Sequence, residues 1–245
     1  MISSKRSILL ICTGLLLTFP VTAPAVFCQS VETLAVDFTR KTVSAAGEEL
    51  VSGTIYFQAP EDVVITVESP VVQWSIFEGA DLLIYYPQER RAFRFISRNR
   101  LIVPFAQSFI GLVREDFGLS DAGFFLRENR KRADVLITVW TPPRTLRPYI
   151  GEAWIGMQKY EKQVHPLFLE LYDPKGNLLT RITYLEYRED LEPSFPGRIL
   201  ILQNGGDGEV RDEIRYSEHR INEILPAEVT DFHLPADVSV EELKW

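Results

Sequence analysis

Residues 62–96 read DVVITVESPVVQWSIFEGADLLIYYPQERRAFRFI, a series of β-branched and aromatic runs divided by short turn sequences. Such runs fit the pleated surface of a sheet, whereas the proline, glycine and acidic residues between them favour turns. Strands are therefore predicted over residues 62–68, 71–77, 82–86 and 91–96. Links this short join antiparallel neighbours, because a parallel crossover needs about a dozen residues or more. The stretch predicts an antiparallel meander.

The spacing of the apolar residues assigns them to faces of this meander. Side chains alternate between the two faces of a strand, so residues two apart lie on the same side. One face is predicted to carry Val63, Ile65, Val67, Trp74, Ile76, Phe93 and Phe95. Residues 82–86 are apolar at every position, which indicates that both faces of the sheet are covered there. One cover is core, and the other is either a ligand cavity or a second side of ordinary core.

The same pattern continues on both sides of this stretch. Further strands are predicted over residues 48–59, 134–141, 152–160, 167–172, 178–187 and 198–203. One helix interrupts the series, beginning at Pro104 and expected to end at Gly118. Its apolar stripe consists of Phe105, Phe109, Leu112 and Val113. Because a helix of this kind must bury its stripe, the fold class is predicted as mainly β (α+β), with one helix covering the sheet.

Composition and motifs disfavour several functions. The chain has 245 residues and a formal net charge of −8, which disfavours a nucleic-acid partner. His165, His219 and His233 are far apart without metal-ligand spacing, and each is expected at the surface or in a turn. Residues 118–123, GLSDAG, miss a nucleophile elbow by one position, and no phosphate-binding loop is present. We therefore expect no catalytic residue, metal or cofactor.

The first thirty residues predict the compartment. Lys5 and Arg6 precede an apolar run that is too short to span a bilayer comfortably, and APA at 23–25 fits a signal-peptidase site. Residues 1–25 are therefore predicted to be a cleaved signal peptide. Residues 26–245 would then form the mature domain in the periplasm. An uncleaved membrane anchor is the alternative interpretation.

The two cysteines are Cys12 and Cys28. Cleavage would leave only Cys28, so no disulfide could form within the mature chain. The lipid-attachment cysteine of bacterial lipoproteins follows a small residue, whereas Phe27 precedes Cys28. Cys28 is therefore predicted to be a free thiol, with lipidation as the alternative.

Six short motifs follow one another along the chain. They are VDFTRK at 36–41, SGTIYFQAP at 52–60, GADLLIYYP at 79–87, PF at 104–105, DPKGNL at 173–178 and FHLPADV at 232–238. Their order and spacing resemble those of the periplasmic outer-membrane lipoprotein carriers, the LolA family, over residues 34–240. Two features depart from the family. Ala59 stands where the family has an arginine that latches its lid, and there is scarcely room for a helix before the first strand.

The resemblance implies an open, incomplete antiparallel β-barrel of about eleven strands with a helical lid. It implies a monomeric carrier, not an enzyme, whose cargo is acylated lipoproteins or lipid. An inner-membrane donor complex would supply this cargo and an outer-membrane acceptor would receive it. Together with the alternation above, it predicts a lipid-binding set of Val63, Ile65, Val67, Trp74, Ile76, Tyr86, Phe93, Phe95, Phe105 and Phe109.

Two other classes of protein are weighed against a carrier. One is a related periplasmic sensor module that binds lipid or lipoprotein and restrains a signalling partner. The other is a transmembrane barrel, since Trp245 is a terminal aromatic residue. Ser239 and Glu241 interrupt the apolar alternation that such a barrel needs before this residue.

Overall fold

The computed structural model describes residues 31–60, 62–78, 81–96, 103–160, 163–191, 193–205 and 208–244. The predicted signal peptide, Cys28 and Trp245 lie outside these ranges. The described residues form one sheet of fourteen strands and two short helices. The strands are β1 (Thr33–Ser44), β2 (Gly47–Gln58), β3 (Asp62–Ser69), β4 (Gln73–Glu78), β5 (Asp81–Tyr86), β6 (Arg91–Ile96), β7 (Phe125–Arg132), β8 (Val135–Thr141), β9 (Glu152–Tyr160), β10 (Gln163–Tyr172), β11 (Leu178–Arg188), β12 (Phe195–Gly205), β13 (Gly208–Ile221) and β14 (Ser239–Lys244).

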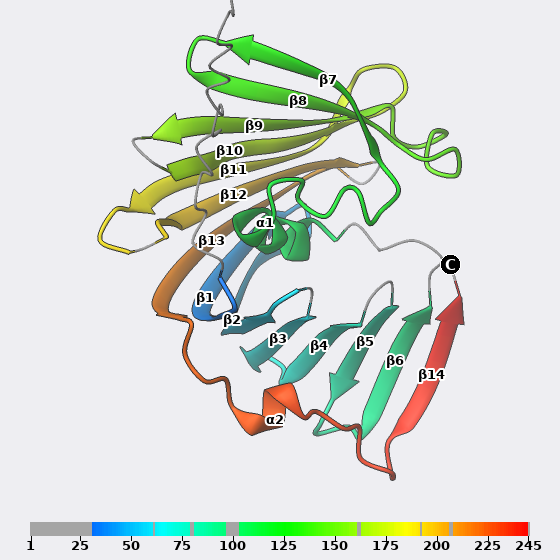
Figure 1. The fold of residues 1–245 in the computed structure, drawn as a ribbon. Coiled ribbons are helices and arrows are strands. Elements are labelled where there is room, and N and C mark those ends of the chain that lie inside the picture. Colours follow the sequence, from blue (N-terminus) through cyan, green and yellow to red (C-terminus); the bar gives the residue numbers. More distant parts are fainter. Residues whose placement is uncertain are drawn as a thin grey trace, which may run out of the picture.

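The sheet is open and curls around one helix. Its strands follow the order β14-β6-β5-β4-β3-β2-β1-β13-β12-β11-β10-β9-β8-β7, so β14 and β7 are its two edges. The described strand pairs are antiparallel except for β14 with β6, which is parallel. Figure 1 shows α1 inside the curve of the sheet. The prediction of an open, incomplete antiparallel barrel with a covering helix is confirmed, with more strands than the resemblance implies.

Two strands that were not predicted from apolar runs, β7 and β14, have little apolar alternation. β7 has the sequence FLRENRKR and is exposed along its whole length, and β14 has the sequence SVEELK. Both strands lie at edges of the sheet, where charged side chains discourage pairing with other molecules. The charges that protect these edges therefore also hide the strands from a search based on apolar periodicity.

The position of α1 (Pro104–Val113) follows from the strand order. β6 lies next to one edge of the sheet and β7 forms the other, so the chain between them must cross the sheet, and α1 lies on its concave side (Figure 1). The helix begins at Pro104 as predicted but ends at Val113, because Arg114 is extended. Gly118 instead adopts a φ of +70° in the turn that follows. In the described ranges, no helix is long and apolar enough to cross a membrane.

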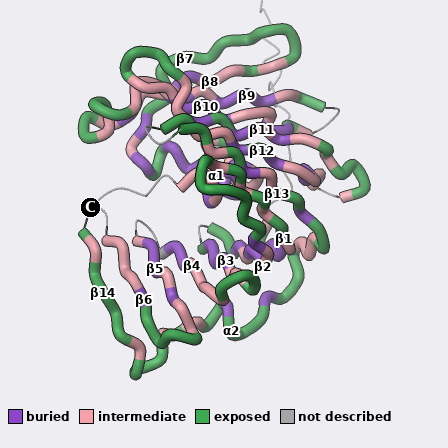
Figure 2. Tube along the Cα trace, turned by 180° about the vertical axis from the view of Figure 1, so that it is seen from behind, coloured by how far each residue is buried: buried purple, intermediate pink, exposed green. Residues whose placement is uncertain are grey.

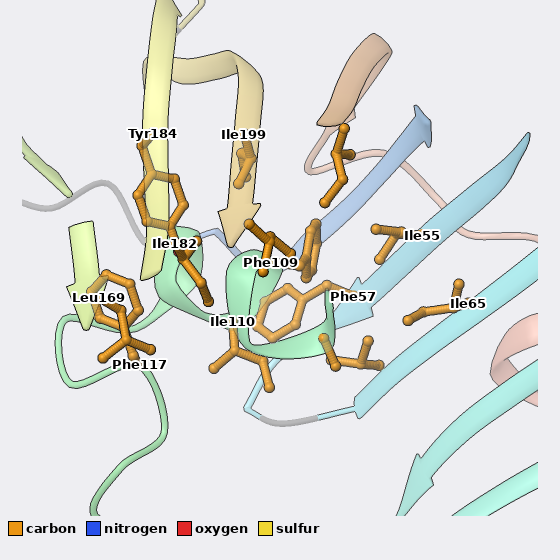
Figure 3. Close-up of a cluster of buried hydrophobic side chains, with 14 of the residues drawn as sticks. Ile55, Phe57, Ile65, Phe109, Ile110, Phe117, Leu169, Ile182, Tyr184 and Ile199 are labelled. Atoms are coloured by element: carbon orange, nitrogen blue, oxygen red, sulfur yellow. The ribbon is translucent and has the colours of Figure 1, made fainter. Parts of the chain in front are cut away.

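Two apolar clusters lie on opposite faces of the sheet. The large cluster fills the concave side, where Phe109 and Ile110 of α1 lie among residues of β2, β3 and β10–β12 (Figure 3). The small cluster covers the outer side of β3–β6. Its cover is residues 222–238, here called the C-terminal strap, which contain α2 (Ala227–Thr230) and lead into β14. In Figure 2 the buried residues concentrate in the inner strands, and β7 is exposed.

Candidate functional site

The register of β3–β6 brings apolar side chains together on the concave face. Directly paired residues of antiparallel strands point to the same face. Val63 pairs with Phe77, Phe77 with Leu82, and Leu82 with Phe95. A neighbouring row consists of Ile55, Ile65, Ser75, Ile84 and Phe93. These rows form a continuous, largely apolar surface across this arm of the sheet.

Most of the predicted lipid-binding residues lie on this concave side. They are Val63, Ile65, Val67, Tyr86, Phe93, Phe95, Phe105 and Phe109. Tyr86 and Phe93 meet edge to face, with ring centroids 6.1 Å apart. Phe105 and Phe109 come from α1, so the structure brings the predicted helix and the predicted strand residues together. Whether these residues bind lipid stays a prediction.

The prediction that Trp74 and Ile76 share this face is wrong. Ile76 pairs with Val64 and Trp74 with Thr66, so both point to the outer face of the sheet. They belong to the small cluster, in which Phe232 of the strap stacks on Trp74 with ring centroids 5.2 Å apart. The alternation within β4 was predicted correctly, but β4 pairs with β3 one residue away from the predicted register. A shift of one residue moves every side chain to the opposite face.

The concave face is closed in one part and half open in another. Where α1 packs on the sheet, Phe109 of the helix and Ile55 of β2 have no exposed surface. Further along the same face, Val67, Ile84 and Phe95 are only half-buried, although they pack against the large cluster. Exposed apolar surface that continues a core is typical of a binding site for an apolar ligand.

The strap forms a pocket of its own, which is too small for such a ligand. It has a volume of about 150 Å³ and lies between the strap and β2–β4. Its lining includes Tyr56, Val64, Ile76, Leu225, Val229 and Phe232. Binding sites for small molecules usually have volumes of ~300 Å³ or more. We therefore place the candidate site on the concave face.

Helix α1 is held on this face mainly by apolar packing. Its ten residues include no ionisable side chain. Phe105 lies against Phe38 of β1 with ring centroids 5.1 Å apart, and Phe109 faces Phe57 of β2 at 6.4 Å. One buried hydrogen bond joins the helix to β11, where the Tyr184 hydroxyl donates to the Ser108 carbonyl at 2.9 Å. The contacts of α1 with the sheet are therefore mostly apolar, with this one hydrogen bond among them.

The turn after α1 anchors the helix at its C-terminal end. Phe117 and Leu119 have no exposed surface and belong to the large cluster. Asp116 holds the turn by accepting hydrogen bonds from the Gly118 N–H and the Ser120 hydroxyl. Burial opposes ionisation of Asp116, but these hydrogen bonds and the charge of Arg114 outweigh it and lower the pKa of this carboxyl.

The sequence analysis did not predict a charged group on the concave face beside α1. Arg40 of β1 lies on the concave face, and its guanidinium carbon is 5.1 Å from the centroid of the Phe105 ring. Its Nε is 3.9 Å from a carboxylate oxygen of Asp212 in β13. The signal was available in the alternation of Leu34, Val36 and Phe38, which places Arg40 on the same face. Ala59, by contrast, is exposed at the end of β2.

The histidines differ in their surroundings. His165 is 9% exposed and stacks on the Tyr187 ring with centroids 4.2 Å apart, so its predicted surface position is wrong. Burial lowers the pKa of His165, which a nearby Glu189 only partly opposes. His219 is half-buried, and burial together with Arg188 lowers its pKa, whereas His233 is exposed.

Within the described residues, no three metal-ligating side chains gather into a possible metal site.

Comparisons with known proteins show which solved structures share this fold. No protein-family model matches the chain, and no curated protein matches it significantly in sequence. A Vibrio parahaemolyticus domain named as an outer membrane lipoprotein-sorting protein superposes with a TM-score of 0.62 at 16% identity, covering 83% of this chain and 91% of that one. A LolA superfamily protein from Nitrosomonas europaea gives 0.55 at 18% identity, covering 81% and 90%. A DUF1329 family protein from Desulfovibrio piger gives 0.57 at 13% identity, covering 82% and 90%.

These similarities define the class of structure. The protein is an open half-barrel with an apolar concave face and a helix inserted into it. Its fold is that of the LolA superfamily and of lipoprotein-sorting domains. The resemblance in the sequence motifs is thus confirmed at the level of the fold.

Proposed function

We propose that this protein is a periplasmic carrier that binds the acyl chains of lipoproteins on its concave face and delivers them to the outer membrane. The observation that carries this proposal is the half-open apolar surface that continues beneath α1. The predicted signal peptide supports the compartment, and the LolA-type fold supports the kind of cargo. The donor would be an inner-membrane complex, and the acceptor would lie in the outer membrane.

Hydrophobic transfer explains why such a carrier would need direct contact with its acceptor. Burial stabilises a chain by about 0.8 kcal/mol per CH₂, so a chain of about sixteen carbons gains on the order of 12 kcal/mol. Escape of this chain into water would be very slow. Movement between two apolar surfaces in contact avoids that cost and needs no nucleotide. The absence of charges in α1 fits this scheme, because apolar cargo can exchange with apolar lid contacts.

A pair of matched variants tests the binding face. Ile84 is half-buried on the concave face, whereas Leu50 is 65% exposed and pairs with Lys41 on the outer face of β2. A carboxylate at position 84 must stay hydrated and would displace several CH₂ groups of cargo. Ile84→Glu should therefore weaken binding of a fluorescent diacyl lipopeptide ~100-fold or more, while Leu50→Glu should leave it unchanged. Equal binding by both variants and the wild type would contradict this binding face.

A dilution experiment separates a carrier from a sensor. Protein loaded with the lipopeptide is diluted into buffer with or without outer-membrane vesicles, and the retained cargo is measured over time. A carrier should keep its cargo in buffer and lose it on contact with the vesicles. Rapid spontaneous loss in buffer would instead favour a sensor module that binds lipid transiently.

A further inference from the structure

Arg40 has a hydrogen-bond donor without a partner. Its side chain is 26% exposed, yet its Nε is buried and makes no hydrogen bond. The distance of 3.9 Å to Asp212 is too long for a hydrogen bond, although the two charges still attract. A buried donor that gives up water without gaining an acceptor lowers the stability of the fold. Such a group in a candidate site suggests that a ligand completes it.

The neighbouring contacts leave the Nε donor of Arg40 without an acceptor. The guanidinium carbon lies over the Phe105 ring, and a cation–π contact of this kind provides no hydrogen-bond acceptor for Nε. Asp212 is 7% exposed and accepts a hydrogen bond of 2.5 Å from the Thr42 hydroxyl. The charge of Arg40 is therefore already balanced, and Asp212 would repel a second anion. What Arg40 lacks is a neutral acceptor such as a carbonyl oxygen.

Beyond Asp212, polar side chains join apolar ones on the concave face. Val210 and Asp212 are alternate residues of β13 and share this face, and Val210 pairs with Gln203, which pairs with Thr180. Val210, Gln203 and Thr180 line an open pocket of about 280 Å³ at the β12–β13 hairpin. The surface thus changes from hydrocarbon-like under α1, through Arg40 and Asp212, to an opening of mixed polar and apolar lining at the rim.

We propose that Arg40 binds the ester or amide carbonyl that joins an acyl chain to its polar head. The acyl chain would lie on the apolar face beneath α1, and the head would lie in the pocket beside Gln203 and Thr180. This inference rests on the proposed function and adds to it a preference for acyl esters and amides over plain hydrocarbon chains. It also assigns one orientation to the cargo, with the head toward the β12–β13 hairpin.

The test compares two probes that differ only in the carbonyl. Monopalmitoylglycerol contains an ester, and 1-hexadecylglycerol is its ether analogue. Each probe displaces a fluorescent apolar dye from the full chain. The wild type should bind the ester about tenfold more tightly than the ether, as expected for a hydrogen bond to a charged donor.

Arg40→Met should remove this preference by weakening ester binding alone. Arg211→Met, on the outer face of β13 and paired with Glu209, is the matched control.

The outcomes separate this inference from the proposed function. If neither probe displaces the dye from the wild type, the proposed function fails. If both probes bind equally well, or if Arg40→Met weakens both to the same extent, the carbonyl site is wrong while acyl binding stands. If Arg40→Met does not fold, the double variant Arg40→Met/Asp212→Asn removes both charges and is tested in the same way. It too should lose the preference for the ester.

Discussion

Single side chains decide how firmly α1 is held on the sheet. Tyr184 is 2% exposed, and its hydroxyl donates the buried hydrogen bond that joins β11 to α1. Tyr184→Phe keeps the ring but removes this bond, which should lower the free energy of unfolding in urea by about 1 kcal/mol. Hydrogen exchange of the α1 amides should also become faster. Tyr149→Phe, at a position 72% exposed, is the control and should change neither quantity. An unchanged exchange rate in Tyr184→Phe would mean that the bond does not hold the lid.

Burial of His165 should make the stability of the fold depend on pH. Burial lowers the pKa of His165, so the folded chain resists the proton that the unfolded chain binds below about pH 6.5. The free energy of unfolding should therefore fall between about pH 7 and pH 5. His165→Phe retains a ring to stack on Tyr187 and cannot titrate, so its stability should fall less over this range. The exposed His233→Phe should follow the wild type. Equal pH dependence of His165→Phe and the wild type would contradict this role for burial.

At the scale of elements, the C-terminal strap should contribute to the stability of the fold but not to binding on the concave face. Phe232 stacks on Trp74 and lies 6.0 Å from the Tyr85 ring centroid, all on the outer face of the sheet. Phe232→Ala should lower the free energy of unfolding by about 2 kcal/mol, because a partly buried ring is lost. Affinity for the diacyl lipopeptide should not change, since the concave face is untouched. Thermal unfolding and lipopeptide titration of the same variant measure both quantities. A loss of binding with full stability would place the cargo under the strap.

The elements also show which features of the fold apolar periodicity predicts and which it does not. Periodicity predicts α1 from Pro104 and the strands that alternate clearly, because burial of one face dictates that spacing. It does not determine the register between strands, which is why Trp74 and Ile76 were placed on the wrong face. The strap was also missed as a cover, because its apolar residues lie in an irregular segment without a period. Arg40 itself has no signal in apolar periodicity, because a charged side chain at its position reads as the end of the apolar face.

At the scale of the whole molecule, strand order places α1 on the concave face, which is the candidate site. β1 and β13, distant in sequence, pair at the middle of the sheet, and the chain between β6 and β7 spans its two arms (Figure 1). The helix in that crossing therefore cannot avoid the concave face. Any ligand on this face would have to share it with α1.

Native mass spectrometry of the protein purified from the cells that produce it tests acyl-chain binding most directly. The wild type and Leu50→Glu should carry bound acylated molecules, identified after extraction by their acyl chains. Ile84→Glu, purified in parallel, should be free of them while retaining the circular dichroism spectrum of the wild type. A wild-type protein that carries no acylated molecule, or an Ile84→Glu variant that carries as much as the wild type, would contradict acyl-chain binding on the concave face.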